Sequence, residues 1–302
     1  MVRTPALTIV IPTYNSAATL RQTLDSIREA REVEVEVVVI DGASDDRTME
    51  IVDSFGDLVS YASSEPDQGI YDAINKGLAR ARGDLIGVVG SDDVLVQGSL
   101  RTILRTWETS GQPDIVAGRA LMVELDGATQ YRADEEYGVG ALLSGIPFCH
   151  NAMFATRQTY LAVGQYDTSY KICADAHWVH RAIRSGRTCT YTEQPIVRFS
   201  LGGTSSREAE KIMEETYKVI AANFEGLSVE DAERLFKAVR GWSDGGEVPD
   251  VLSRNRHNPD ILISASMAFL ARSRRNPPPI NAKQSASWRN LIRRFRAALI
   301  SS

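Results

Sequence analysis

Apolar and polar positions alternate in blocks along the first third of the chain. Continuous apolar runs of strand length occupy residues 7–11, 35–40, 58–62 and 84–90. Between them, apolar residues recur at helical spacing in residues 17–30, 48–54 and 70–82. We expect Ser16 or Asn15 to cap the first of these helices and Gly83 to end the third. Successive strand–loop–helix units of this kind predict an α/β fold, with a mostly parallel sheet flanked by helices.

Beyond residue 112 the pattern changes twice. Strand-like runs occupy residues 115–125, 151–155, 188–192 and 196–199, with a helix expected over 175–185. Helical spacing then dominates residues 205–224, 228–239 and 259–272. A run of prolines at 276–280 indicates a semi-rigid linker. These changes predict four parts: an α/β half (1–112), the second half of the same domain (113–204), a helical extension (205–275), and a linker with a tail (276–302).

Polar loops follow all four apolar strands of the first third. They contain Pro12-Thr13-Tyr14-Asn15, then Asp41, then residues 65–68, and finally Ser91-Asp92-Asp93. Ligands of parallel α/β sheets bind beyond the carboxyl ends of the strands, so these loops indicate one binding site on a shared rim. No GxGxxG fingerprint follows a strand, which argues against a nicotinamide-binding site.

Four side chains on this rim carry candidate chemistry. Asp92 and Asp93 would repel each other when buried, and Mg²⁺ or Mn²⁺ bound to a diphosphate would compensate that repulsion. Asp41 could accept hydrogen bonds from a base or a ribose, and Tyr14 could stack on a nucleobase. Each residue also has a purely structural interpretation: the aspartates as turn or capping carboxylates, the tyrosine as a packed ring.

The order of these segments resembles family 2 glycosyltransferases, inverting enzymes with the GT-A fold, and especially their bacterial exopolysaccharide and O-antigen members. The resemblance covers residues 7–205 and rests on residues 11–15, 39–46, 65–77 and 91–93. It implies that Asp93 binds the divalent metal and that Asp92 contacts the ribose or the nucleotide-sugar. It also implies a nucleotide-sugar site that includes Pro12, Tyr14, Asp41 and Asp67.

The resemblance extends into the second half of the domain. Tyr170-Lys-Ile-Cys-Ala-Asp-Ala-His-Trp178 is similar to a segment that carries the catalytic base of relatives, a role that here falls to Asp175. His177 stands where relatives often have a second aspartate, and we assign it, with His150 and Trp178, to the acceptor side. Residues 199–205 resemble a Gly-Gly loop that relatives place near the donor diphosphate.

One carboxylate and one metal site would suffice for the chemistry. An inverting transfer needs a base for the acceptor hydroxyl, whereas a metal can neutralise the leaving diphosphate. Asp175 also has a structural interpretation, because a carboxylate in the first turn of a helix is favoured by the macrodipole.

Composition narrows the class of protein. Of 302 residues, 43% are apolar and 24% charged, which is typical of a soluble globular chain. No run approaches the ~20 apolar residues of a spanning helix. The first six residues lack a signal-peptide pattern, and the three cysteines form no CxxC pair. We therefore expect a cytoplasmic protein.

Charge is distributed unevenly. The net charge of −5 combines 26 basic and 39 acidic residues up to Asp260 with eight basic residues and no acidic one beyond it. An acidic body does not favour nucleic-acid binding. In the tail, apolar residues recur at helical spacing among arginines: Trp288, Leu291, Ile292, Phe295, Ala298 and Leu299. Such a segment suits an anionic membrane surface at the inner face of the cell membrane, or alternatively the acidic body or a second subunit.

The favoured hypothesis is a metal-dependent glycosyltransferase that moves a sugar from a nucleotide diphosphate sugar, a UDP-sugar by the resemblance, to a glycan or lipid-linked acceptor with inversion. A nucleotidyltransferase of related fold is less favoured, because no Gly-rich loop with Lys or Arg follows the first strand. A non-catalytic membrane scaffold that retains the fold is the third hypothesis.

Overall fold

The computed structural model describes residues 5–30, 32–124, 126–201 and 208–275. Its strands are β1 (Leu7–Thr13), β2 (Val35–Asp41), β3 (Val59–Ser64), β4 (Leu85–Val88), β5 (Val94–Leu95), β6 (Ile115–Val123), β7 (Thr129–Tyr131), β8 (Met153–Thr156) and β9 (Cys189–Ser200). Its α-helices are α1 (Leu20–Glu29), α2 (Thr48–Asp53), α3 (Ile70–Arg80), α4 (Ser99–Thr109), α5 (Arg157–Val163), α6 (Ala174–Arg184), α7 (Ala209–Ala222), α8 (Val229–Arg240), α9 (Val248–Arg254) and α10 (Pro259–Arg275). Two 3₁₀ turns are η1 (Val139–Leu143) and η2 (His150–Ala152).

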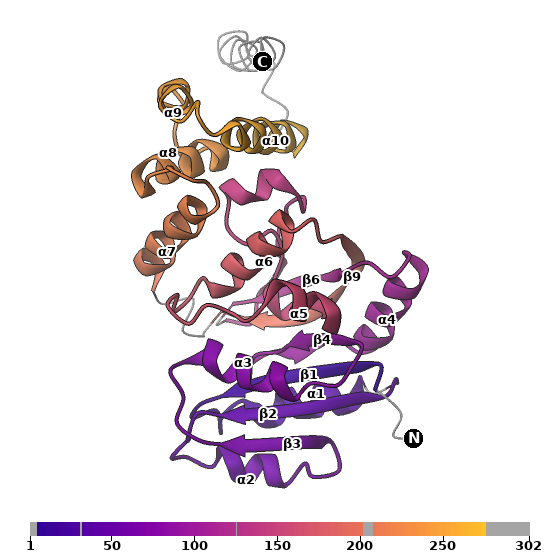
Figure 1. Ribbon diagram of the computed structural model, residues 1–302. Coiled ribbons are helices and arrows are strands. Elements are labelled where there is room, and N and C mark those ends of the chain that lie inside the picture. The colour runs from indigo at the N-terminus through magenta and orange to yellow at the C-terminus, as the bar shows by residue number, and fades with distance from the viewer. Residues whose placement is uncertain (1–4, 31, 125, 202–207, 276–302) are drawn as a thin grey trace. The chain divides into compact units, whose positions relative to one another are not determined.

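The chain divides into two compact units. Unit 1 comprises Met1–Glu135 and Ile146–Glu215 and contains the sheet (Figure 1). Unit 2 comprises Glu136–Gly145 and Thr216–Ser302, and its described part consists of η1 and helices of the predicted extension. No helix in the described ranges is long and apolar enough to cross a membrane. The predicted tail helix and linker, 276–302, lie outside those ranges.

The sheet of unit 1 has the strand order β3-β2-β1-β4-β8-β6-β9-β5, with β7 paired to β6. The first four strands of this order are parallel, as the sequence predicts (Figure 1). Strand β8 then runs antiparallel between β4 and β6, and β9 is parallel to β6. The sheet is therefore mixed, and one antiparallel strand joins the two halves of the domain.

Alternate residues of the central strands face different helices. In one core cluster, Leu7, Ile9 and Ile11 of β1 pack with the apolar stripe of α1. The intervening Val10 contacts α3, because a Cβ atom placed on Gly77 would collide with its side chain. Burial on both faces explains why these strands read as continuous apolar runs.

The first predicted helix starts later than expected. Helix α1 begins at Leu20, and neither Ser16 nor Asn15 caps it through a side chain. Instead the carbonyl of Ser16 accepts the N–H groups of Thr19 and Leu20 at 3.1 and 3.0 Å. The polar side chains of the loop are thereby free to bond to the neighbouring loops of the rim.

The sequence suggested that Gly83 ends the third helix, but the structure shows a different end. Helix α3 ends at Arg80, and its C-cap residue is Ala81. A Cβ on Gly83 would lie 2.6 Å from the backbone nitrogen of Thr8 and 2.7 Å from its Oγ1. A glycine is needed here because the backbone passes against β1.

Other differences concern short or merged elements. The runs at 188–192 and 196–199 form one strand, β9, with register shifts against β6. Helices α4, α5 and α9 and strands β5 and β7 were not predicted, although Leu100, Ile103, Leu104 and Trp107 of α4 follow helical spacing.

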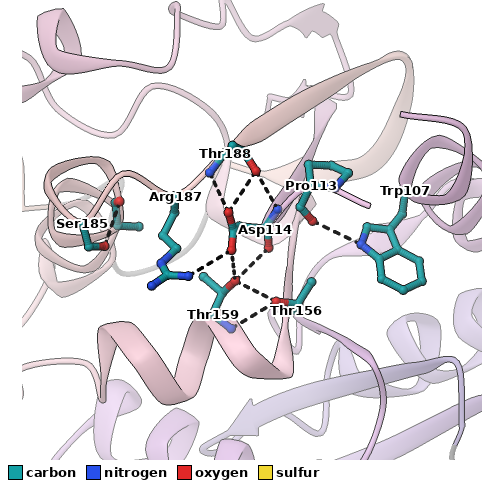
Figure 2. A network of polar contacts seen from close by, with 9 residues as sticks. Trp107, Pro113, Asp114, Thr156, Thr159, Ser185, Arg187 and Thr188 are labelled. Carbon is teal, nitrogen blue, oxygen red and sulfur yellow. Dashed lines mark hydrogen bonds and ion pairs between the residues drawn. The ribbon is translucent and has the colours of Figure 1, made fainter. Parts of the chain in front are cut away.

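The start of β6 is fixed by Asp114 (Figure 2). Its Oδ2 accepts the backbone N–H and the hydroxyl of Thr188, both at 2.9 Å, and its Oδ1 accepts the Thr159 hydroxyl at 3.1 Å. Arg187 adds an ion pair at 3.3 Å. Burial would raise the pKa of Asp114, but these hydrogen bonds lower it. One carboxylate thus joins the beginnings of β6, α5 and β9 at the edge opposite the polar rim.

A second buried carboxylate, Glu36 of β2, holds the same edge between β1 and β4. It accepts the hydroxyl of Thr8 at 2.7 Å and, from Arg82, the backbone N–H at 2.8 Å and the side-chain Nε at 2.6 Å. Only 4% of its side chain is exposed. Burial would raise the pKa of Glu36, but the hydrogen bonds from Thr8 and Arg82 lower it below its ordinary value of 4.5.

Glu36→Gln should therefore lower the free energy of unfolding by about 2 kcal/mol at pH 7, because a charged acceptor of three hydrogen bonds is lost. A carboxyl whose folded pKa is lowered stabilises the protein above its unfolded pKa and loses that contribution as pH falls through the folded pKa. The difference in the free energy of unfolding between the unaltered protein and Glu36→Gln should thus disappear below about pH 4.5. Urea unfolding from pH 7 to pH 3 measures this difference, with exposed Glu34→Gln as control. A difference that does not change with pH would contradict the role of Glu36.

Candidate functional site

The carboxyl ends of β1, β2 and β3 meet at the buried carboxylate of Asp41, which is 0% exposed. Its Oδ1 accepts the hydroxyls of Thr13 at 3.0 Å and Ser44 at 2.5 Å. Its Oδ2 accepts the Ser44 N–H at 2.9 Å and the Ser64 hydroxyl at 2.6 Å. Burial would raise the pKa of Asp41, but the hydrogen bonds from Ser44, Ser64 and Thr13 lower it. Both oxygens are occupied by the protein, so in this structure Asp41 joins the loops of the rim.

The loop after β1 is bonded along its length to the loop after β2. The N–H of Asn15 donates to the Ser44 hydroxyl at 2.8 Å, and Asn15 Oδ1 accepts the Asp45 N–H at 3.0 Å. Asn15 has the positive φ of 48° that asparagine tolerates better than most residues. The N–H of Ala17 donates to Asp46 at 3.0 Å. The two loops therefore form one rigid piece of the rim.

Tyr14 of this piece and Asp67 of the loop after β3 flank Gly42. A Cβ on Gly42 would lie 2.7 Å from Asp67 Oδ2 and 3.4 Å from Tyr14 Cδ2. Tyr14 is 66% exposed, so its ring is available to a ligand. Pro12 is buried within β1, where it is paired with Ile40 of β2. The structure brings Tyr14 and Asp67 together at the surface and places Pro12 beneath them.

Asp92 and Asp93 follow β4 and converge beside Gly90. A Cβ on Gly90 would lie 2.8 Å from Asp93 Oδ2 and 3.1 Å from Asp92 Oδ1. Asp93 is 1% exposed, and burial followed by the charge of Asp92 raises its pKa to about 7. Burial also raises the pKa of Asp92. Among the described residues, no Lys, Arg or His forms an ion pair with either carboxylate, so the ionised pair is disfavoured there.

Two residues that the sequence analysis did not assign hold Asp93 in place. Asn151 donates its side-chain amide to Asp93 Oδ2, and the N–H of Ser200 donates to Asp93 Oδ1 at 3.0 Å. The Ser200 hydroxyl also donates to the carbonyl of Asp92 at 2.8 Å. They lie 58 and 107 residues from Asp93 along the chain. The resemblance placed residues 199–205 near the donor diphosphate, but neither hydrogen bond to Asp93 was predicted. The predicted Gly-Gly loop beyond Ser200 falls within residues 202–205, outside the described ranges.

Asp175 lies half-buried in the first turn of α6, where its Oδ1 accepts the Ala176 N–H at 2.7 Å. Two side chains from other elements sense its charge. Burial raises the pKa of Tyr71 well above its usual value, and the charge of Asp175 raises it further. Burial lowers the pKa of His150, and the negative charge of Asp175 partly offsets this effect. His150 precedes Asn151, the partner of Asp93. Of these two neighbours, Asn151 contacts Asp93 directly, whereas His150 is affected by Asp175 only through its charge.

The three residues expected on the acceptor side lie in different surroundings. His150 Nε2 is 2.8 Å from the Tyr166 hydroxyl. Trp178 is fully buried, with its indole N–H donated to the Gly164 carbonyl at 2.8 Å and its ring stacked on Tyr166. The structure thus corrects the expectation for Trp178: its ring belongs to the core behind Asp175 and has no surface to offer an acceptor.

His177 is half-buried beside Tyr170, with ring centroids 4.8 Å apart. Burial, and then the charge of Arg181, lowers its pKa. Its Nδ1 is inaccessible to solvent and has no hydrogen-bond partner among the described residues. The neutral imidazole is therefore the form that this environment favours.

The donor set at Asp92 and Asp93 fits a hard divalent cation. Carboxylate oxygens are the ligands that Mg²⁺ and Mn²⁺ prefer, and a cation would offset the repulsion that raises the pKa of Asp93. Among the described residues, no group of three or more His, Cys, Asp or Glu side chains could hold a metal. Further oxygen ligands at this pair would have to come from water or from a bound ligand.

Comparison with known proteins gives consistent matches. Residues 8–164 match the family model described as glycosyl transferase family 2. A PGL/p-HBAD biosynthesis glycosyltransferase of Mycobacterium bovis is 31% identical over 175 residues, which are 57% of this chain and 67% of that protein. An uncharacterized glycosyltransferase of Mycobacterium tuberculosis is 29% identical over 202 residues, 60% of this chain and 70% of that protein.

Solved structures share the fold. TarS of S. aureus (residues 1–349, in complex with UDP-GlcNAc) matches with a TM-score of 0.61 and 17% identity, over 96% of this chain and 87% of that one. A longer TarS chain matches with a TM-score of 0.60 and 17% identity, and the present chain spans 53% of its length. At this identity the likeness establishes the GT-A architecture of the sheet and its helices.

Proposed function

The chain belongs to glycosyl transferase family 2, and we propose that it transfers a sugar, with inversion, from a UDP-sugar to a hydroxyl of a glycan or lipid-linked acceptor. The observation that carries this proposal is the carboxylate pair after β4: Asp92 and Asp93 converge beside Gly90, and the buried Asp93 is held by Asn151 and Ser200.

The nucleotide part of the donor would lie along the rim at Tyr14 and Asp67. The exposed ring of Tyr14 offers a stacking surface for the base, and the Asp67 carboxylate lies beside it at Gly42. Asp41 would shape this site from below, together with Pro12, and its occupied oxygens favour positioning over direct contact with the base. The UDP-GlcNAc complex of TarS, which shares the fold, supports a uridine nucleotide.

Asp93 would hold a Mg²⁺ or Mn²⁺ ion, and Asp92 would contact the ion or the ribose. When bound, such an ion supplies positive charge that stabilises the departing diphosphate. Asn151 and Ser200 keep Asp93 oriented toward Gly90, since each occupies one of its oxygens. The protein thus contributes an oriented pair of carboxylates, and the donor phosphates would complete the ligand set.

Asp175 would act as the base. Its carboxylate takes the proton of the acceptor hydroxyl while that oxygen forms the new bond to the anomeric carbon. The bond from the anomeric carbon to the diphosphate breaks on the opposite face, and UDP leaves, so the configuration inverts. His150 and His177 would face the acceptor as neutral imidazoles. A relative named as a PGL/p-HBAD biosynthesis glycosyltransferase supports sugar transfer to an acceptor made in a biosynthetic pathway.

Asp175→Asn should reduce turnover at least about 100-fold, because the amide cannot accept the proton. Release of UDP, with water as acceptor, from a panel of UDP-sugars measures turnover, and calorimetry measures UDP affinity, which should stay within about twofold. The matched control is Asp53→Asn, an exposed carboxylate of α2. Full turnover in Asp175→Asn would refute the assignment of the base, and a parallel loss of UDP affinity would make Asp175 a binding residue.

Asp93→Asn should abolish the dependence of UDP release on added Mn²⁺ or Mg²⁺ and weaken metal-dependent UDP binding about tenfold or more, because one ionic ligand is lost. Chelation by EDTA should have the same effect on the unaltered protein and be reversed by metal. Asp84→Asn, at the other end of β4, serves as control because its side chain is exposed. UDP release that is insensitive to EDTA would rule out the metal role.

We also propose peripheral attachment to an anionic membrane through the tail. In unit 2, α10 supports it with a second apolar stripe of Ile263, Met267 and Leu270, which are 42–43% exposed. Arg274, 73% exposed, follows on the same side one turn later. The chain beyond residue 275 then adds five cations among apolar residues at helical spacing. Apolar and cationic positions would thus meet the same lipid surface.

Removal of residues 276–302 should therefore abolish cosedimentation with phosphatidylglycerol vesicles at low salt, since each cation contributes ~1 kcal/mol near such a surface. Binding of the full chain should weaken in 0.5 M salt and be absent with phosphatidylcholine. UDP release should be unchanged by the deletion. Equal cosedimentation of both chains would contradict attachment through the tail.

A further inference from the structure

The turn that leads into Asp175 is held by a buried carboxylate from a distant helix. Glu215 of α7 accepts the N–H of Lys171 at 2.8 Å through Oε1, and the N–H groups of Ile172 at 2.8 Å and Cys173 at 2.9 Å through Oε2. Only 7% of Glu215 is exposed. Three successive backbone donors of one turn therefore share a single side chain.

The charge of Glu215 suits this position. The turn ends at Cys173, the N-cap residue of α6, where the helix macrodipole is positive and backbone N–H groups lack helical partners. Burial would raise the pKa of Glu215, but the three N–H groups lower it. The carboxylate is thus ionised near neutral pH, when hydrogen bonds to it are strong.

Tyr71 of α3 holds the same turn from a different element. Its hydroxyl donates to the carbonyl of Ile172, and its ring stacks on Tyr166 with centroids 5.7 Å apart. The N–H of Ile172 is bound to Glu215 and its C=O to Tyr71, so both peptide groups at this residue are fixed. Asp175 follows three residues later, in the first turn of α6.

We propose that Glu215 is a positioning residue for Asp175. By fixing the 171–173 backbone, it sets the direction in which α6 begins and hence where the Asp175 carboxylate points. Its contacts are to backbone groups behind the base, so it acts through Asp175 and does not itself meet substrate. The inference rests on the proposed function, in which Asp175 is the base.

Glu215→Gln is the direct test. The amide nitrogen of glutamine donates hydrogen bonds, so it cannot accept the N–H that one carboxylate oxygen now accepts. We expect kcat for UDP release from the best donor of the panel to fall about 10- to 100-fold, the range of a misplaced catalytic group. The KM for that donor and the Kd for UDP with Mn²⁺ should change less than about twofold. Glu214→Gln, exposed on the same helix, should behave like the unaltered protein.

Hydrogen exchange gives a second readout. Amides 171–173 should exchange faster in Glu215→Gln, whereas peptides from β1 and β2 should be unchanged. Tyr71→Phe removes the hydroxyl that bonds to the Ile172 carbonyl and that also lies within the electrostatic influence of Asp175. It should lower kcat in the same way, again with little effect on UDP affinity. If Glu215→Gln does not fold, Glu215→Asp, which keeps the charge but shortens the side chain, tests the role of Glu215 itself, and an unchanged kcat there would overturn that role.

The outcomes separate this inference from the proposed function. Full turnover in both Glu215→Gln and Tyr71→Phe, while Asp175→Asn is inactive, would overturn the positioning role and leave the base intact. An equal loss of UDP affinity and kcat in folded Glu215→Gln would overturn it too, because the residue would then support the site in general. Activity of Asp175→Asn would instead remove the proposed base itself.

Discussion

The carboxylate of Asp41 is the contact on which the arrangement of the rim depends. Asp41 is the last residue of β2 and is fully buried. Its carboxylate accepts hydrogen bonds from β1, from the loop after β2 and from β3. A buried charge is tolerated only when it is paired or hydrogen-bonded, so the loops must keep the geometry that satisfies it. That geometry holds the loop of Tyr14 against the loop after β2, with Asp67 beside it at Gly42.

The second half of the site depends on one antiparallel strand. Strand β8 lies between β4 and β6, and η2 directly precedes it. Asn151 of that turn contacts Asp93, and its neighbour His150 senses the charge of Asp175. Because β8 pairs with β4, the turn before it brings Asn151 against Asp93, although the two residues are 58 positions apart in the sequence. Buried polar contacts then fix both carboxylate centres: Asn151 and Ser200 at Asp93, Glu215 and Tyr71 before Asp175.

Much of the fold could be predicted because its signals are local. The central parallel strands β1, β2 and β4 read as apolar runs since both faces are buried, and most of the long helices show helical spacing. Boundaries were less predictable: α1 begins at Leu20 because backbone bonds to Ser16 replace a side-chain cap, and Gly83 serves the approach to Thr8. Candidate site residues that follow strands, such as Asp93, were found from their position. The hydrogen bonds made by Asn151, Ser200 and Glu215 were not predicted, because their partners lie 42 to 107 residues away.

The sequence by itself determined the parallel α/β order, the polar loops at the strand ends and the family resemblance, since each depends on neighbouring residues. Only the tertiary structure decided the surroundings of each side chain. It placed Trp178 in the core, closed both oxygens of Asp41 with protein donors, and raised the pKa of Asp93 through burial and the nearby Asp92. Burial, hydrogen bonding and charge at one residue are set by segments that fold against it, and spacing along the chain does not encode their distance.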